Sequence, residues 1–167
     1  MQVKNREELF VLLLSHLRQG TERAATILEE LGDAAQNAEI KEALHARAFV
    51  THKILATLDE AFKQIGQKPA NLPGRLHDAF VEDFRRELAE IQSLEGKRLF
   101  VLAKAHQFIS LRTAEYLVLI AAADASGNHG VAVLLESCLA DNLAFVERNR
   151  RLIRKIVEAR IAAAKSA

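Results

Sequence analysis

Cysteine, proline and tryptophan are scarce or missing in this chain of 167 residues, and each absence excludes a class of protein. The lone Cys138 allows neither an intrachain disulfide nor a cysteine metal cluster, so we expect it to pack as a small apolar residue. The two prolines, Pro69 and Pro73, stand in one segment, KPANLPG, and leave the rest of the chain free for long helices. The aromatic residues are mostly phenylalanines on helical stripes, which indicate a core and not a base-stacking platform.

Signals for export, for membranes and for common catalytic sites are also missing. The opening residues MQVKNREELF contain no apolar signal segment, and no apolar run approaches the length of a membrane span. We therefore expect a cytoplasmic protein. No glycine-rich phosphate loop, nucleophile elbow or hydrolase triad pattern is present.

The formal net charge of +1 gives the whole molecule no strong attraction to nucleic acid, but the charge is unevenly distributed. The basic side chains gather near the C-terminus, at Arg148, Arg150, Arg151, Arg154, Lys155, Arg160 and Lys165. We interpret this segment as the solvated face of a helix end, where cations also suit the helix dipole. Binding of an anionic partner, such as nucleic acid or a membrane, is the alternative.

Good helix formers dominate the composition, and no segment alternates as a strand would, so the sequence predicts an all-α fold. The apolar spacing predicts helices over residues 6–35, 38–66, 75–94, 97–125 and 131–164. In the second of them the apolar stripe contains Leu44, Ala48, Thr51, Leu55, Leu58, Phe62 and Ile65. Glu95 and Gly96 are expected to separate the third helix from the fourth.

The lengths of the helices and of their connections predict the architecture. Short turns join the first helix to the second and the fourth to the fifth, so each pair is expected to form an antiparallel hairpin. The third helix is shorter and serves as the crossover between the hairpins. The expected fold is a single domain over residues 1–167, a ferritin-like up-down four-helix bundle with one shorter crossover helix.

The second helix contains a stretch, EALHARAFVTHKIL, that invites a metal interpretation. His45 and His52 are seven residues apart and so share a helix face. A di-iron helix carries Glu three residues before its His, but Phe49 occupies that position before His52. Glu42 and His45 do have this spacing, although no matching pair on another helix accompanies them.

Five stretches in chain order resemble the YciE/YciF family of ferritin-like bacterial stress proteins. They are ELFVLLLSHL, HARAFVTH, HDAFVEDF, TAEYLVLIAAADASG and LLESCLADN, one on each predicted helix. The resemblance spans nearly the whole chain. It implies a bundle whose interior holds carboxylates and histidine for a dinuclear metal site, and it implies a homodimer.

Most of the ligand positions implied by the resemblance hold other residue types here. The full set of ligand positions is Thr21, Phe49, His52, Ile109, Arg112, Asp141 and Asn142, and among them His52 keeps the residue type of the family. On the first helix, Glu22 stands one residue after Thr21, and a one-residue shift would make it the ligand. Only Glu22, His52 and Asp141 could still bind iron or manganese, which are too few ligands for two ions.

Arg112 replaces a carboxylate of the resembled family and opposes metal binding by its charge. We predict that its guanidinium pairs with Glu22 or Asp141 inside the former metal cavity, with His52 nearby as a hydrogen-bonding core histidine. Phe49 and Ile109 are expected to fill the remaining volume. In the alternative, Arg112 points outward or lies at a dimer surface.

The remaining histidines, His16, His77, His106 and His129, show no mutual spacing and are expected at the surface or at helix caps. Tyr116, the only tyrosine, is expected in the core with a hydrogen bond; near a di-iron centre its hydroxyl could instead serve redox chemistry.

Three functions follow from these residues. The first is a non-catalytic bundle with a degenerate, metal-free site that acts by binding or assembly. The second is a dinuclear-metal oxidase or peroxide scavenger, and the third is an anion-binding accessory protein that uses the basic C-terminal helix. The run YLVLIAAA, apolar on all sides, favours a homodimer, since a partner chain could cover one of its faces.

Overall fold

The protein is described by a computed structural model that covers residues 3–165, with side chains through Ile161. It consists of five helices, and the described residues contain no strand. Their bounds are α1 Arg6–Ala34, α2 Ala38–Gln64, α3 Arg75–Glu90, α4 Leu94–Ala125 and α5 His129–Lys165. The all-α prediction is confirmed.

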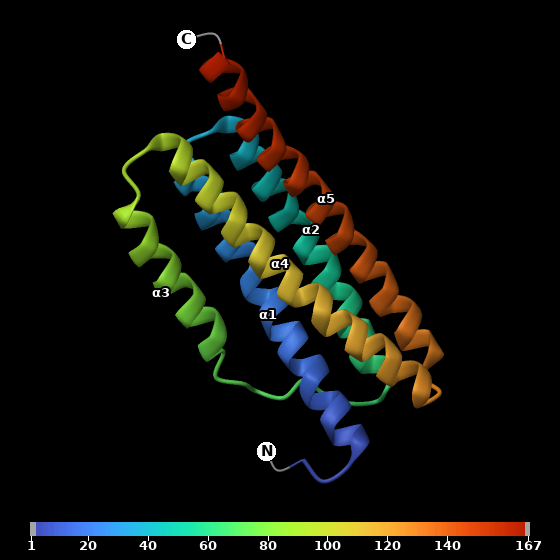
Figure 1. Cartoon of the computed structure of the whole chain (residues 1–167). Helices are drawn as coiled ribbons and strands as arrows, with labels where there is room; N and C mark the ends of the chain where they lie inside the picture. The colour runs from blue at the N-terminus through green and yellow to red at the C-terminus, as the bar shows by residue number, and fades with distance from the viewer. Residues whose placement is uncertain (1–2, 166–167) are drawn as a thin grey trace.

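The four long helices form the predicted bundle (Figure 1). α1 and α2 make one antiparallel hairpin, α4 and α5 make the other, and the hairpins meet through α1 against α4 and α2 against α5. The crossover helix α3 lies outside this bundle, along α1 and α4, and covers only part of their length. The last turns of α5 extend beyond the ends of the other helices.

Side-chain caps account for where three of the helices begin. Asn5 and Asn37 accept hydrogen bonds from the backbone N–H groups of Glu8 and Ile40, at 2.8 and 3.0 Å. Ser93 caps α4 in the same way by accepting from the N–H of Gly96 at 3.0 Å. The expected break at Glu95 and Gly96 is therefore wrong: both residues belong to the first turn of α4, because Ser93 supplies the cap.

Two clusters of buried side chains form the core, one toward each end of the bundle. The stripe predicted for α2 is largely confirmed, since Leu44, Ala48, Thr51, Leu58 and Phe62 are all buried. Cys138 is also buried, as predicted, and this burial raises the pKa of its thiol to about 11. A thiol held neutral in this way is a packing residue at neutral pH.

One helix is longer and more apolar than the sequence analysis allowed. By length and composition, His129–Ile161 of α5 could cross a membrane, a test that a core helix of a soluble bundle also passes. Within the bundle it packs against α4 and α2.

Candidate functional site

The former metal-site positions do not converge in the structure, and Phe49 departs furthest from its prediction. It was expected to fill the interior, but 79% of its surface is exposed. Its neighbour Ala48 belongs to the buried stripe, and one residue along a helix is a rotation of about 100°. Phe49 therefore points away from the core, and that prediction is wrong.

His52 and Glu22 point outward, and Asp141 is only half-buried. His52 is exposed and is not the core histidine that was predicted. Glu22 is exposed and pairs with Arg18 at 3.4 Å, while Asp141 pairs with Lys53 at 3.5 Å. The predicted cluster of Glu22, His52, Arg112 and Asp141 is therefore not formed.

The remaining positions do face the interior. Thr21, and not Glu22, is the buried residue at this place on α1, and its hydroxyl donates to the carbonyl of Leu17 at 2.8 Å. Ile109 is buried in the core cluster, as predicted. Asn142 is buried and accepts a hydrogen bond from Arg47, a residue that the sequence analysis did not single out.

Arg47 is a cation inside the bundle, with 6% of its surface exposed. Besides Asn142, its guanidinium donates to the hydroxyl of Thr51 at 3.4 Å and lies 5.9 Å from the ring centre of Phe145. No carboxylate of the described residues pairs with it, and burial lowers its pKa. The signal for Arg47 was present in the sequence, since it stands between Leu44 and Thr51 on the buried side of the stripe.

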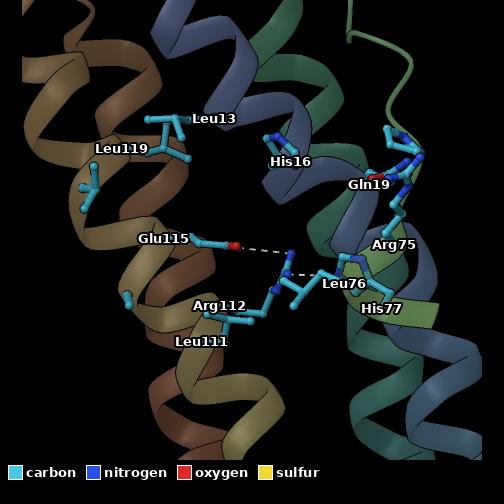
Figure 2. Close-up of a pocket in the computed structure, with 14 residues that line it drawn as sticks. Leu13, His16, Gln19, Arg75, Leu76, His77, Leu111, Arg112, Glu115 and Leu119 are labelled. Atoms are coloured by element: carbon cyan, nitrogen blue, oxygen red, sulfur yellow. Dashed lines mark hydrogen bonds and ion pairs between the residues drawn. The ribbon is translucent and has the colours of Figure 1, made fainter. Parts of the chain in front are cut away.

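Arg112 is buried as predicted, with 3% of its surface exposed, but its partners differ from those predicted. One terminal nitrogen lies 2.9 Å from Nε2 of His77, and the other lies 3.1 Å from a carboxylate oxygen of Glu115 (Figure 2). The guanidinium also lies over the ring of Phe108, at 5.7 Å. Glu22 and Asp141 have no part in this arrangement.

Gly20 makes room for this guanidinium. A Cβ atom added at Gly20 would lie 1.6 Å from a terminal nitrogen of Arg112 and 2.3 Å from its central carbon. Gly20 therefore lets the Arg112 side chain lie directly against the backbone of α1.

His77 is the other correction, because it was expected at the surface and is buried. Burial, together with the charge of Arg112, lowers its pKa to about 4. A guanidinium can only donate, so the neutral ring accepts on Nε2 and carries its proton on Nδ1. Burial raises the pKa of Glu115, and Arg112 opposes that shift.

These side chains border a pocket of about 470 Å³ between α4 and the N-terminal end of α3 beside α1 (Figure 2). Apolar side chains make up most of its wall: Leu13, Leu76, Leu111, Ala114, Val118 and Leu119. Its polar members are His16, Gln19, Arg75, His77, Arg112 and Glu115. The pocket lies where α3 begins, because α3 covers only part of the length of α1 and α4.

The residues present do not fit a dinuclear metal centre. No three His, Cys, Asp or Glu residues within the described chain could hold one ion together. Two guanidinium groups are buried instead, that of Arg47 between α2 and α5 and that of Arg112 between α1, α3 and α4, and both would repel a divalent cation. At the shifted site, the side chain of His45 lies 3.5 Å from Asp33 and contacts no further metal-ligand type among the described residues.

Tyr116 is buried as predicted, but its hydroxyl has no hydrogen-bond partner within the described chain. Burial is the main cause that raises its pKa.

Comparison with solved structures shows similarity over nearly the whole chain. The E. coli stress protein YciF superimposes with a TM-score of 0.88 at 21% identity, over 93% of this chain and 99% of that one. YcfI, a putative structural protein from Rhodopseudomonas palustris, gives a TM-score of 0.84 at 21% identity, over 89% of this chain and 95% of that one. No curated protein matches the sequence. Residues 5–162 match the family described as a domain of unknown function, DUF892, and the chain is therefore a YciF-like member of the DUF892 family.

Proposed function

We propose that this chain is a metal-free, non-catalytic, cytoplasmic member of its family that acts by binding or assembly. The observation that carries the proposal is an exchange of charge among the side chains of the bundle helices. Arg47 and Arg112 are buried on α2 and α4, while Glu22 and His52 are exposed and Asp141 is half-buried beside Lys53. A dinuclear centre needs anionic oxygen ligands around two divalent ions, and this interior offers cations instead.

Metal analysis tests the proposal against the oxidase alternative. Protein purified without chelators from cells grown in iron-rich medium is expected to contain only a small fraction of an equivalent of iron or manganese. A content that approaches a dinuclear centre per chain would refute the proposal. If an Arg112→Met variant remains equally free of metal, the absence of metal is due to the lack of ligands and not to repulsion by the charge of Arg112 alone.

Assembly into a homodimer is part of the proposal, and α4 supports it. Leu117 has 57% of its surface exposed within the apolar run YLVLIAAA. It points away from the pocket, since it lies on the flank of α4 opposite Glu115 and Leu111. A second copy of the chain would remove this side chain from water.

Sedimentation velocity over a range of concentrations tests the dimer. The wild-type chain is expected to sediment as a dimer, and Leu117→Glu is expected to shift it toward monomer at the same concentration. Phe49→Glu is the matched control, since Phe49 is an equally apolar exposed side chain on a different helix. A wild-type chain that stays monomeric, or a Leu117→Glu variant that stays dimeric, would contradict an interface through α4.

The basic end of α5 gives less support to an anionic partner than the sequence did. Lys155 pairs with Glu39 at 2.7 Å, Arg160 pairs with Glu95 at 3.4 Å, and Glu147 lies within 3.3 Å of both Arg150 and Arg151. These pairs neutralise much of the positive face. The side chain of Lys165 lies outside those that the structure describes.

A further inference from the structure

The pocket beside Arg112 contains buried polar atoms that no group in the described chain satisfies. Nε of Arg112 and Nδ1 of His77 have no hydrogen-bond partner; the terminal nitrogen of Arg112 beside Glu115 has only the ion pair with that carboxylate, whose oxygen likewise makes no hydrogen bond. Both residues are more than nine-tenths buried. Unsatisfied buried donors are costly in a folded protein, so a ligand that accepts hydrogen bonds would be stabilised here.

The N-terminus of α3 opens onto the same pocket without a side-chain cap. Gly74 occupies the cap position with a φ of 64°, and it has no side chain to accept from the first turn. The backbone N–H groups of Arg75 and Leu76 make no hydrogen bond within the part of the chain described. A helix N-terminus of this kind favours an anion through its free donors and its dipole.

The charges around the pocket point the same way. Arg75 and Arg112 are its cations, and Glu115 is its only acid among the lining residues. One added negative charge would balance this set. The guanidinium of Arg23 also approaches Gly74, where it donates to the carbonyl oxygen at 3.2 Å, but its charge is paired with Asp78.

We propose that this pocket binds a small organic monoanion, a carboxylate with a short apolar chain. The carboxylate lies between Arg112 and the first turn of α3, which line the same pocket. The apolar chain lies against Leu13, Leu111 and Val118, which would otherwise face water. The proposal deepens the binding role proposed above, yet its failure would leave the metal analysis unaffected.

Glu115 allows a prediction that a simple apolar pocket would not: removal of its charge should strengthen binding of the anion. Its carboxylate lies 3.1 Å from a terminal nitrogen of Arg112 without the geometry of a hydrogen bond. A bound carboxylate must compete with it for the guanidinium. Neutralising Glu115 should therefore strengthen binding of the anion, although it removes a polar group from the pocket.

Isothermal titration calorimetry of the full chain tests the inference with four small probes. Octanoate has both the anionic head and the apolar chain. Octanol lacks the charge, octylamine reverses it and acetate lacks the chain. Octanoate is expected to bind at least about tenfold more tightly than each of the other three. Equal binding of octanol, or an octanoate dissociation constant above about 10 mM, would overturn the proposal.

Variants then test the residues. Arg112→Met is expected to weaken octanoate binding about tenfold or more, and Glu115→Gln to strengthen it about threefold. Arg150→Met removes an exposed arginine on α5 and is the control, expected to leave binding unchanged. Circular dichroism checks that each variant is folded. If Arg112→Met does not fold, Glu115→Gln decides, since unchanged or weaker binding in that variant would contradict the competition described above.

Discussion

Replacement of Gly20 by alanine tests whether the Arg112 guanidinium lies against α1. In an ordinary helix interior, Gly→Ala stabilises a protein by about 1 kcal/mol, because alanine restricts the unfolded chain and favours the helix. Here the new Cβ atom would lie 1.6 Å from a terminal nitrogen of Arg112, so the guanidinium must leave its place. It would then lose its contact with His77.

The expected magnitude follows from those two opposing effects. A buried hydrogen bond to a charged group contributes about 1.5–3 kcal/mol, and the helix gain offsets about 1 kcal/mol of its loss. Gly20→Ala should therefore destabilise the wild-type chain by about 0.5–2 kcal/mol. In an Arg112→Met background the same change meets no guanidinium and should stabilise the chain by up to about 1 kcal/mol.

Urea unfolding of the four proteins in this cycle gives the coupling free energy directly. We expect about 1.5–3 kcal/mol of coupling between the two positions, with the sign of the Gly20→Ala effect reversed between backgrounds. Gly20→Ala that stabilises both backgrounds equally would refute the placement of the guanidinium against α1.

Two further predictions concern the buried cation and the buried histidine. Asn142→Ala should destabilise the chain by about 2–3 kcal/mol in urea unfolding, because it removes a buried hydrogen-bond acceptor of Arg47. Asp141→Ala is the control: it removes a partly exposed ion pair and should cost about 1 kcal/mol or less. Equal effects at the two positions would contradict the buried network. The folded-state pKa of His77 is lowered from 6.5 to about 4, so the neutral ring stabilises the fold above the unfolded-state pKa. This contribution, at most about 3 kcal/mol, should be lost as the pH falls from 6.5 through 4. His77→Gln, which keeps a neutral acceptor for Arg112, should lose less stability than the wild-type chain over that pH range, and identical pH profiles would show that His77 is not the titrating group.

Periodicity predicted the fold well because it depends on burial averaged over many residues. The stripe of Leu44, Ala48 and Thr51 placed the core side of α2 correctly. An N-cap is a weaker sequence signal because it depends on a single residue, and the cap that Ser93 supplies to α4 was missed for that reason. Its bond to the N–H of Gly96 extends α4 back through residues that otherwise favour a turn.

The candidate site was harder to predict because it depends on single residues and on contacts between helices. Placing Phe49 and His52 inside the bundle followed the family resemblance and ignored that both lie off the stripe of α2. Arg47 lies on the buried side of that stripe, but a charged residue is rarely assigned to a core from sequence. The approach of His77 to Arg112 could not be derived at all, since it depends on how the crossover helix lies against α1 and α4.

The central claim is that the chain lacks the ligands of a metal centre and buries two guanidinium groups on its bundle helices, and a thermal unfolding titration with metal tests it most directly. An ion that binds only the folded chain stabilises it by RT ln(1 + [ion]/Kd), so the unfolding temperature rises with the logarithm of the ion concentration above the dissociation constant. We predict that neither ferrous iron, added anaerobically, nor manganese changes the unfolding temperature of the metal-free chain. An increase in the unfolding temperature that grows with metal concentration and disappears with a chelator would contradict the account.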